Sequence, residues 1–438
     1  MKQSEILNNI AGKMGIESLN PMQKAVMDCQ SKNIVLLSPT GSGKTLGFSI
    51  SMLQSLPKPS PEVKAVIIAP SRELVTQIYR VVRDIATGYK CVALYGGHSV
   101  SDEKKSLVPA PDIIVATPGR LLDHLQRKHV DLYNTKILVL DEYDKSLELG
   151  FHDEMKKIIR TMPNLSRIIL TSATRLQEMP EFLKLKSPET LDFLDNGNNP
   201  GKRMSIVEVP SPANDKLDTL IDLLKSLQNG KVIIFVNHRE SADRVYQGLR
   251  KAGLPAGIYH GALDQLDREK AVDLLNNGAT PILVSTDLGA RGLDIDSVHS
   301  IIHYHQPLTE ETWTHRNGRT ARVDATGTIY VITSENDNIP EYMEFDRSYS
   351  PSGKSDDPIR SDVATLYFNA GKKEKISRGD IVGFLIKQCG LQPDTIGKII
   401  VKDHSAIAAV PLQKAKEAIA KSAQEKLKGK RVKVTLMK

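Results

Sequence analysis

Short hydrophobic runs alternate with amphipathic stretches along most of the chain. Each run has the length of a buried strand, and each stretch between two runs has the periodicity of a helix. The runs are 33–37, 64–69, 90–95, 112–116, 136–140 and 167–170, and then 231–236, 256–259, 281–285, 299–304 and 328–333. Strands that alternate with helices form parallel sheets with both faces covered. The pattern therefore predicts two α/β domains in series.

Two clusters of turn-forming residues divide the chain. Residues 195–201 read Asp-Asn-Gly-Asn-Asn-Pro-Gly, and residues 348–358 are rich in Ser, Pro, Gly and Asp, as linkers are. Beyond the second cluster the pattern predicts strand 363–368, helix 380–389, strands 398–402 and 406–410, helix 412–427 and strand 431–436. We therefore predict α/β domains over 1–200 and 201–346, a linker over 347–361 and a small βαββαβ domain over 362–438.

In the last predicted strand, hydrophobic and polar residues alternate. Val432, Val434 and Leu436 occupy one face, and Arg431 and Lys433 lie on the other. We therefore expect one face of this strand to be buried and the other to be basic.

Charge is distributed unevenly over a composition that is ordinary for a globular protein. The 438 residues are 40% hydrophobic and 25% charged, with a net charge of +7. Residues 360–438 hold 17 Lys and Arg against 7 Asp and Glu, whereas the remainder holds 42 against 45. A basic end on a near-neutral body indicates a polyanionic partner that binds at that end.

Cysteine usage and hydropathy exclude several classes of protein. Cys29, Cys91 and Cys389 are scattered, which argues against a disulfide framework or a zinc site. No stretch reaches the ~18 apolar residues that a membrane span needs, and the first residues lack a signal-peptide core. We expect a soluble, cytoplasmic protein that binds no membrane.

A glycine-rich segment follows the first hydrophobic run and precedes a helical stretch. Backbone N–H groups around Gly41 and Gly43 can close on phosphate oxygens, and Lys44 can supply charge to the β- and γ-phosphates. The Thr45 hydroxyl can bind Mg²⁺. The segment is therefore predicted to be a P-loop, in which the nucleotide-binding residues are Ser38, Pro39, Thr40, Gly41, Ser42, Gly43, Lys44 and Thr45.

An acidic box, Asp141-Glu-Tyr-Asp144, follows the run 136–140. In P-loop enzymes an acid at the carboxyl end of a strand holds Mg²⁺. We predict that Asp141 and Thr45 hold Mg²⁺, partly through water, and that Glu142 takes the proton of an attacking water.

Three further segments make the pattern specific: Ser172-Ala-Thr174, residues 285–294 (Ser-Thr-Asp-Leu-Gly-Ala-Arg-Gly-Leu-Asp) and residues 315–322 (His-Arg-Asn-Gly-Arg-Thr-Ala-Arg). With the P-loop and the acidic box, they resemble the motifs of DEAD-box RNA helicases, over roughly residues 15–335. The resemblance implies two tandem RecA-like P-loop domains with parallel sheets. It also implies an enzyme that hydrolyses ATP with Mg²⁺ and acts on RNA.

The resemblance assigns roles around the nucleotide. It implies that Gln23 reads adenine and that Asp294 touches the ribose. It assigns coupling between nucleotide and RNA to Asp144, Ser172, Thr174 and His315, and arginine fingers to Arg319 and Arg322. The implied catalytic set is Lys44, Thr45, Asp141, Glu142, Arg319 and Arg322.

Phosphoryl transfer gives an independent reason for such fingers. The transfer needs positive charge on the γ-phosphate, so fingers from a second domain would act only when the domains close. Arg319 and Arg322 are three residues apart and could face one side if their segment began a helix.

The resemblance also implies contacts to the RNA backbone. They fall at Pro70, Arg72, Gly97, Thr117 and Arg120 in the first domain and at Arg239, Gly261 and Thr286 in the second. Such contacts go mostly to phosphate and 2′-OH, so we expect little sequence preference there.

The basic end carries a second resemblance. Residues 371–382 and 396–399 resemble the C-terminal RNA-binding domain of the bacterial DbpA and DeaD helicases, which implies an RRM-like fold and structured ribosomal RNA as target. Tyr367 and Phe368 alternate faces, so at most one can stack on a base. We expect RNA binding by Lys428, Lys430, Arg431 and Lys433 instead. A basic domain that serves only solubility stays an alternative.

Besides Ala321, which stands where the family has Gly, three positions depart from the DEAD-box pattern. Tyr143 replaces a small residue, so we expect altered packing with catalysis intact. Asn317 stands where the family has an apolar residue, and His305 where an Asp is usual.

The predicted function is that of a monomeric RNA helicase that remodels ribosomal RNA, with ribosomal precursor particles as possible partners. One alternative is an ATP-gated RNA clamp or assembly factor with little unwinding. Another is a DNA helicase.

Overall fold

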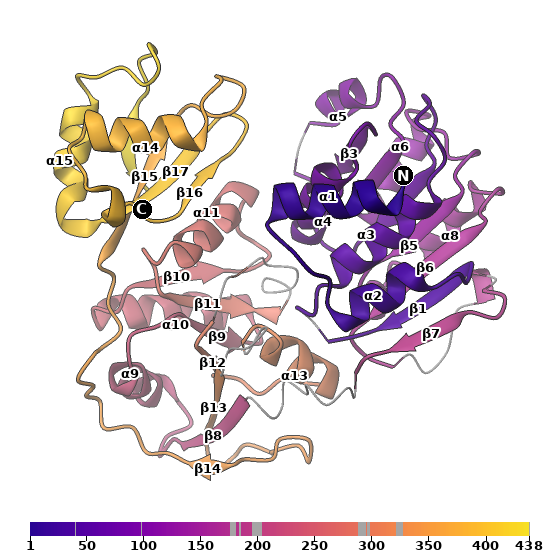
Figure 1. Cartoon of the computed structure of the whole chain (residues 1–438). Helices are drawn as coiled ribbons and strands as arrows, with labels where there is room; N and C mark the ends of the chain where they lie inside the picture. Colours follow the sequence, from indigo (N-terminus) through magenta and orange to yellow (C-terminus); the bar gives the residue numbers. More distant parts are fainter. Residues whose placement is uncertain are drawn as a thin grey trace. The chain divides into compact units, whose positions relative to one another are not determined.

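The computed structural model describes residues 1–39, 41–97, 99–175, 181–183, 185–194, 204–287, 295, 298–320 and 327–437. The chain forms two compact units, the first made mainly of residues 1–203 and the second of residues from Met204 onward (Figure 1). The predicted linker at 195–201, Asp294 and Arg322 lie outside the described residues.

The first unit is built on a seven-stranded parallel sheet. Its strand order is β3-β4-β2-β5-β6-β1-β7. The strands are β1 (Asn33–Leu37), β2 (Ala65–Ile68), β3 (Cys91–Leu94), β4 (Ile113–Ala116), β5 (Ile137–Leu140), β6 (Arg167–Ser172) and β7 (Glu189–Asp192). All six runs predicted before residue 195 are therefore strands.

Helices enclose this sheet on both faces (Figure 1). Adjacent strand residues such as Ile34 and Val35 enter separate hydrophobic clusters, so both faces are buried, and the runs are hydrophobic throughout for this reason. The helices are α1 (Gln3–Met14), α2 (Pro21–Asp28), α3 (Lys44–Ser55), α4 (Arg72–Ile85), α5 (Val100–Ser106), α6 (Pro118–Gln126), α7 (Tyr143–Glu148), α8 (His152–Arg160) and the 3₁₀ turn η1 (Glu181–Leu183).

The second unit begins with another seven-stranded parallel sheet, of order β10-β11-β9-β12-β13-β8-β14. Its strands are β8 (Met204–Pro210), β9 (Val232–Val236), β10 (Ala256–Tyr259), β11 (Ile282–Thr286), β12 (Ser300–His303), β13 (Gly327–Thr333) and β14 (Arg347–Ser348). Its described helices are α9 (Leu217–Ser226), α10 (Arg239–Lys251), α11 (Gln265–Asn276) and α13 (Glu310–Asn317). The prediction of two α/β domains is confirmed.

The tail domain, residues 362–438, folds in the predicted βαββαβ order as an antiparallel sheet, β16-β17-β15-β18. Its helices pack against one face of that sheet (Figure 1). The elements are β15 (Val363–Phe368), α14 (Arg378–Lys387), the 3₁₀ turn η3 (Pro393–Thr395), β16 (Ile399–Val401), β17 (Ala406–Pro411), α15 (Leu412–Ser422) and β18 (Val434–Met437).

Two details of the tail prediction are wrong. The last helix ends at Ser422 instead of 427, and beyond it Lys428 and Gly429 adopt left-handed φ angles and turn the chain back, so that Leu427 pairs with Lys430. The last strand begins at Val434, and Leu436 is 39% exposed. Only the first two members of the predicted hydrophobic face are buried.

The other face of the tail sheet meets the second RecA-like domain. Asn277, which follows α11, donates a 2.8 Å hydrogen bond to Thr365 of β15, and both side chains are buried. Lys402 lies 2.8 Å from Asp273 and 3.0 Å from Glu269. Burial alone would lower the pKa of Lys402, but the two carboxylates raise it above its ordinary value. The second unit thus includes a buried polar contact between its two domains.

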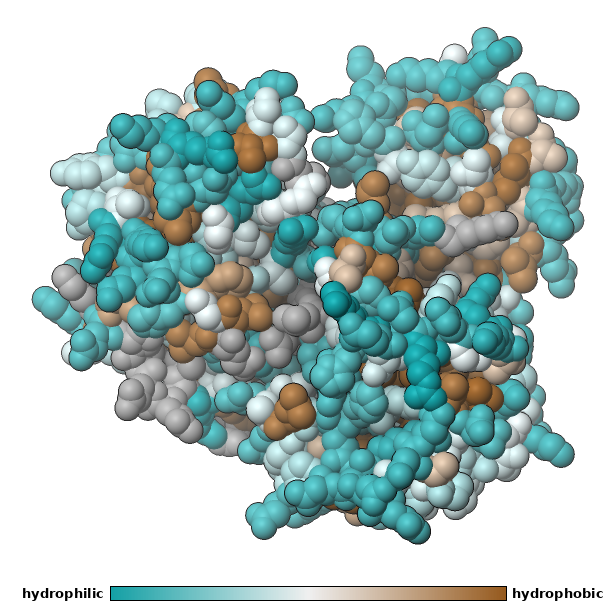
Figure 2. Space-filling model, turned by 180° about the vertical axis from the view of Figure 1, so that it is seen from behind, coloured by the Kyte–Doolittle hydropathy of each residue, from teal (hydrophilic) through white to brown (hydrophobic). Residues whose placement is uncertain are grey.

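The face seen in Figure 2 is mainly hydrophilic, as a composition with 25% charged residues leads us to expect. Figure 2 shows one face on which hydrophilic residues dominate and hydrophobic residues form separate patches. Among the described residues, no helix is long and apolar enough to cross a membrane.

Candidate functional site

The P-loop connects β1 to α3 and is closed around its own lysine. Gly41 and Gly43 have φ angles of 81° and 89°, in the left-handed region that favours glycine. The buried Lys44 Nζ donates to the carbonyl oxygens of Ser38 at 2.6 Å and Pro39 at 2.9 Å. The loop therefore has the left-handed glycines of a P-loop and holds its lysine inside, and the predicted phosphate contacts stay a prediction; Thr40 lies outside the described residues.

Gln23 lies directly against this loop. Its Oε1 accepts from the Asn20 N–H at 3.0 Å in the capping box of α2, and its Nε2 donates to the Gly43 carbonyl at 3.2 Å. A Cβ on Gly43 would lie 2.5 Å from Gln23 Nε2, so the contact requires glycine. The tertiary structure thus joins the predicted adenine reader to the P-loop.

The first two acids of the box, Asp141 and Glu142, lie at the carboxyl end of β5. Asp141 is buried, and burial raises the pKa of its carboxyl, while the Thr171 hydroxyl and Lys44 act in the opposite direction. Glu142 has a left-handed φ of 46°, an unusual backbone for a residue with a side chain and one that is common at functional sites.

Thr171 is a site residue that sequence reasoning missed. Its hydroxyl donates to Asp141 Oδ1 at 2.5 Å and accepts from the Glu142 N–H at 3.2 Å, so it orients both acids. It lies on β6 just before Ser172, and its proximity to that motif was the one available signal. Its partners are about 30 residues away, and only the pairing of β5 with β6 brings them together.

Asp144 connects the acidic box to the segment after β6. Its Oδ2 accepts from the Thr174 hydroxyl at 3.0 Å and from the Ala173 N–H at 3.3 Å. The Ser172 hydroxyl donates to the Thr174 carbonyl at 2.6 Å and accepts from its N–H at 3.1 Å. Three of the four residues predicted to couple nucleotide and RNA therefore form one bonded cluster.

Tyr143 fills a space in the hydrophobic cluster beneath the acidic box. Its side chain is completely buried against that cluster, and its hydroxyl has no hydrogen-bond partner among the described residues. Burial raises the pKa of this hydroxyl, so it stays neutral. Tyr143 is therefore accommodated within the hydrophobic cluster, and the expectation that catalysis stays intact remains a prediction.

The edge of the first sheet is divided between two sets of residues. The P-loop, the acidic box and Ser172-Ala-Thr174 follow β1, β5 and β6, which are adjacent in the sheet. The predicted RNA residues follow β2, β4 and β3, which are also adjacent: Pro70, Arg72, Gly97, Thr117 and Arg120. One sheet edge therefore carries both sets side by side.

The second sheet repeats this arrangement. Arg239, Gly261 and Thr286 lie at the carboxyl ends of its adjacent strands β9, β10 and β11. His315 is buried in α13, and Arg319 is buried just after the helix ends at Asn317. Arg319 is therefore not part of a helix, and Arg322, the other predicted finger, lies outside the described residues.

The comparisons with known proteins agree with this geometry. Three family models match: DEAD/DEAH box helicase over residues 20–182, helicase conserved C-terminal domain over 215–324, and DbpA RNA binding domain over 365–436. The ATP-dependent RNA helicase DbpA of Escherichia coli (strain K12) is 32% identical, with 97% of this chain and 96% of that protein aligned. This chain belongs to the DEAD-box RNA helicases of the DbpA type.

Other relatives support this assignment. The ATP-dependent RNA helicase DbpA of Bacillus subtilis (strain 168) is 29% identical over 98% of this chain and 97% of its own length. Among solved structures, S. cerevisiae Dbp5 bound to RNA and ADP BeF3 has a TM-score of 0.67 at 27% identity, covering 76% of this chain and 88% of that one. Mss116p bound to ssRNA and AMP-PNP has a TM-score of 0.67 at 27% identity, covering 80% and 77%. The chain is therefore an RNA-dependent ATPase.

In this DEAD-box helicase, Arg72 and Arg120, which are predicted to contact RNA, each lie against a specific partner of the first domain. Arg72 lies across Gly96, where an added Cβ would come within 2.9 Å of the guanidinium. Arg120 lies 3.4 Å from the buried Glu103, which also contacts His124 at 2.9 Å. Glu103 was missed by sequence reasoning, because a lone acid in a polar helix carries no signal.

Arg316 is a further residue that was missed, although it lies inside the motif at 315–322. Its guanidinium is buried, contacts Asp287 at 2.5 and 2.8 Å and donates to Asn237 Oδ1 at 2.8 Å. Asp287 directly follows Thr286. Arg316 therefore links α13 to a strand end that is predicted to contact RNA.

The structure explains one unusual residue of this helicase. Asn317 Oδ1 lies 2.9 Å from Nε2 of the buried His303. Burial, with Arg316 nearby, lowers the pKa of His303 to about 3, so the ring is neutral. An amide at 317 therefore satisfies a buried ring nitrogen that an apolar residue would leave unpaired.

The four predicted tail cations differ from one another. Lys428 Nζ donates to the Lys375 carbonyl at 3.0 Å and to Asp380 at 3.1 Å, and Lys430 Nζ donates to the Glu374 carbonyl at 2.6 Å. Arg431 and Lys433 are exposed, and no ion pair is described for either. Two of the cations therefore hold the loop before α14.

Proposed function

We propose that this helicase uses ATP hydrolysis to open short duplexes in structured RNA, and that its target is ribosomal RNA during ribosome assembly. The division of one sheet edge into nucleotide and RNA halves is the observation that carries the proposal. The hydrogen bond between Asp144 and Thr174 connects the segments that follow β5 and β6. A structural change caused by ATP binding or hydrolysis can therefore be transmitted between these strand ends while the sheet stays folded.

In this mechanism Lys44 binds the phosphates of ATP. Its ammonium is held by two neutral carbonyl oxygens, and a phosphate is a stronger partner because its charge assists the hydrogen bond. Glu142 accepts the proton of the attacking water. The amide of Gln23 can both donate and accept, and so it can select adenine.

The donor set fits Mg²⁺. Thr45 and Asp141 offer the hard oxygen ligands that Mg²⁺ prefers, and this ion is usually held by one or two carboxylates together with substrate phosphates. No group of three or more His, Cys, Asp or Glu side chains that could cage a metal is found among the described residues. When bound, the ion would neutralise charge on the β- and γ-phosphates.

The second RecA-like domain completes the site when the two domains close on ATP and RNA. Arg319 and Arg322 then supply positive charge to the γ-phosphate, Asp294 contacts the ribose, and His315 reaches Asp144. Hydrolysis removes the γ-phosphate that the fingers contact, so RNA would be released after each turnover.

The tail domain tethers the enzyme to its RNA. Lys428 and Lys430 position the segment 371–378, which presents the exposed cations Lys372, Lys373 and Arg378 beside Arg431 and Lys433. Clustered exposed cations suit phosphate binding. The match to the DbpA RNA binding domain and the resemblance to that group support structured ribosomal RNA as the target.

We also propose a cytoplasmic monomer. Cys29, Cys91 and Cys389 are free thiols, which suits a reducing compartment. Sedimentation with and without RNA would test the monomeric state.

The decisive experiment is strand release from a ribosomal RNA hairpin that carries a short labelled duplex. The wild-type protein should release the strand only with ATP. Glu142→Gln should bind ATP and RNA but hydrolyse ATP roughly 10²–10⁴-fold more slowly. Glu17→Gln, a change at an exposed acid of the same domain, is the matched control and should behave as wild type.

Each alternative has its own outcome in this assay. Retention of RNA on ATP binding without strand release would contradict the unwinding proposal and favour a clamp. Equal stimulation of hydrolysis by DNA of the same sequence would contradict RNA as substrate, since only RNA offers 2′-OH groups. Unchanged hydrolysis in Glu142→Gln would overturn the role of that acid.

A further inference from the structure

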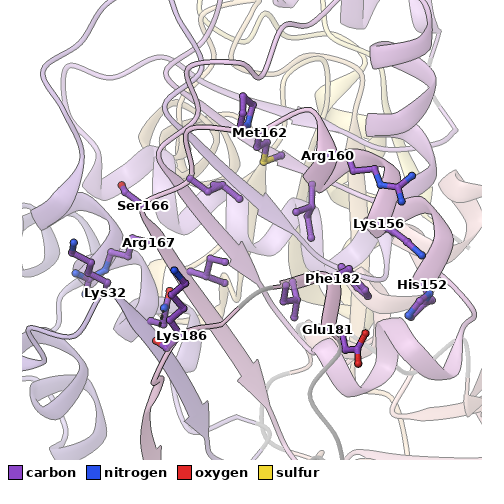
Figure 3. Close-up of a pocket in the computed structure, with 16 residues that line it drawn as sticks. Lys32, His152, Lys156, Arg160, Met162, Ser166, Arg167, Glu181, Phe182 and Lys186 are labelled. Atoms are coloured by element: carbon purple, nitrogen blue, oxygen red, sulfur yellow. Dashed lines mark hydrogen bonds between the residues drawn. The ribbon is translucent and has the colours of Figure 1, made fainter.

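A large groove lies on the first RecA-like domain at the edge of the sheet opposite the P-loop. It has a volume of about 1170 Å³ and is bordered by α8, the loop 162–166, η1 and the first residues of β1 and β6. In Figure 3, Lys32, Arg167 and Lys186 lie on one side, His152, Lys156 and Arg160 lie on the other, and Phe182 lies between them. We call this the basic groove.

Positive charge is in excess in the described lining of the basic groove. Lys32, Lys156, Arg160, Arg167 and Lys186 line it, against Glu181 as the one carboxylate in its described lining. No carboxylate of the described residues lies within ion-pair distance of Lys32, Lys156, Arg160 or Lys186. Cations gathered on facing walls create a positive potential that attracts anions.

The floor of the groove is apolar. The ring of Phe182 meets His152 edge-on at 4.8 Å and is only partly buried. Other floor residues are Ile159, Met162, Leu165, Ile168 and Leu183. A ligand that fits must therefore combine repeated negative charge with flat or apolar groups.

We propose that the basic groove binds a single-stranded segment of RNA, with phosphates on the two cationic walls and bases against the floor. An unpaired strand carries one charge per nucleotide and exposes its bases, and cations along a groove with an aromatic surface are the usual means of holding it. An acidic peptide would also fit the charge, but RNA is the partner that the family of this chain already binds.

The groove is separate from the sites described above. Asn33 and Arg167 begin the strands β1 and β6, whose opposite ends lead to the P-loop and to Ser172-Ala-Thr174. Arg167 also donates to the Ser51 hydroxyl of α3 at 2.8 Å, which fixes one wall to the P-loop helix. RNA in the groove would therefore extend the footprint of the enzyme without occupying the ATP site.

The test compares two RNAs on the full chain by fluorescence anisotropy at several salt concentrations. One is a ribosomal RNA hairpin, and the other is the same hairpin with a 20-nucleotide oligouridine extension. The double variant Lys156→Ala, Arg160→Ala should lose the added affinity for the extension. Its salt slope on the extended RNA should fall by about 1.4, at ~0.7 for each phosphate contact on a single strand.

Lys157→Ala is the matched control. Lys157 is exposed on the same helix, carries the same charge and does not line the groove. It should leave both RNAs unaffected. A second double variant on the opposite wall, Lys32→Ala with Lys186→Ala, should reproduce the loss, which guards against a local folding defect in α8.

Several outcomes would overturn the proposal. They are an unchanged salt slope in both double variants, an equal loss in Lys157→Ala, and no added affinity for the extension in the wild type. Affinity for the hairpin alone reports on the tail domain. If the wild type did not bind the hairpin, the proposed tether would be contradicted. The groove proposal would still be tested by the difference in affinity between the extended and the unextended hairpin.

Discussion

The nucleotide site of the first RecA-like domain and the basic surface of the tail domain hold their charges in opposite ways. Lys44, Asp141 and Asp144 are buried, and each is held by internal hydrogen bonds. The four tail cations predicted to bind RNA are exposed, and Lys428 and Lys430 are bonded within the domain. Chemistry on a phosphate requires fixed geometry, whereas a tether requires only a concentration of charge.

This difference determines how each region should respond to substitution. A buried network fails as a unit, because one displaced group leaves others unsatisfied. An exposed basic surface loses affinity in small, nearly additive steps. The four predictions below test this contrast, from the largest expected effect to the smallest.

Gly43→Ala should reduce ATP binding and hydrolysis at least ~100-fold, because a methyl group would collide with Gln23 and strain the left-handed backbone. Gly47→Ala is the control: it lies in α3, and its Cβ would meet Met22 Sδ at an ordinary 3.4 Å. Nucleotide titration and steady-state hydrolysis measure the effect. The affinity of the tail domain for RNA should be unchanged in both variants. Near-normal ATP hydrolysis in Gly43→Ala would contradict the expectation that the buried network of this site fails as a unit.

Replacing Lys372, Lys373 and Arg378 together with alanine should weaken binding of structured RNA while basal ATP hydrolysis persists. Each lost phosphate contact should lower the salt slope by about 0.9, and single variants should add up. Lys387→Ala, exposed at the other end of α14, is the control. If one single variant lost all binding of structured RNA, the expected additive behaviour of the exposed tail cations would be contradicted.

Lys402→Ala should loosen the tail domain from the second RecA-like domain. The change leaves the buried carboxylate of Asp273 without this cation and should cost about 1–2 kcal/mol. Thermal unfolding should then show an earlier transition, whereas Lys416→Ala, exposed on α15, should not. Coincident melting curves for all three proteins would show that this ion pair contributes nothing.

His303→Gln should flatten the acid dependence of stability. The folded pKa of His303 is about 3, far below its unfolded value near 6.5, so the unfolded chain binds the extra proton in between. Wild-type stability should therefore fall as pH drops from about 6.5, by up to ~1.4 kcal/mol per pH unit from this ring. Phe235, Trp313, Arg316 and Asn317 surround the ring.

Denaturant unfolding at pH 7 and at pH 5 measures this difference. His238→Gln, a change at an exposed ring of the same domain, is the control and should keep the wild-type pH dependence. If the free energy of unfolding changed equally between pH 7 and pH 5 in wild type and His303→Gln, the ring of His303 would not be held neutral.

The sequence predicted strands well where both sheet faces are buried. Such strands, for example β1 and β9, consist of continuous hydrophobic residues. It missed β7, which is mostly exposed and joins the sheet by pairing with β1 alone. It also missed β8, whose partly buried residues lack a continuous run. A strand in such a position is identified by its hydrogen-bonding neighbour and not by its own composition.

Site residues were predictable when they lie in one local motif. The P-loop and the acidic box are contiguous segments with defined chemistry. Thr171, Glu103 and Arg316 were not predicted, because each acts on partners that are distant in sequence or carries no distinctive neighbours. The sequence also did not predict that Lys428 and Lys430 hold a loop. In a sequence, a lysine that bonds to a loop cannot be distinguished from a lysine that binds phosphate.

By itself, the sequence determined the family, the P-loop and its acids, and the basic end, because local backbone chemistry and charge are written in consecutive residues. Tertiary structure alone decided that nucleotide and RNA segments share one sheet edge, that Thr171 orients both acids, and that scattered cations line one groove. The physical reason is that strand order in a parallel sheet is set by crossover connections and packing, and no local pattern encodes it.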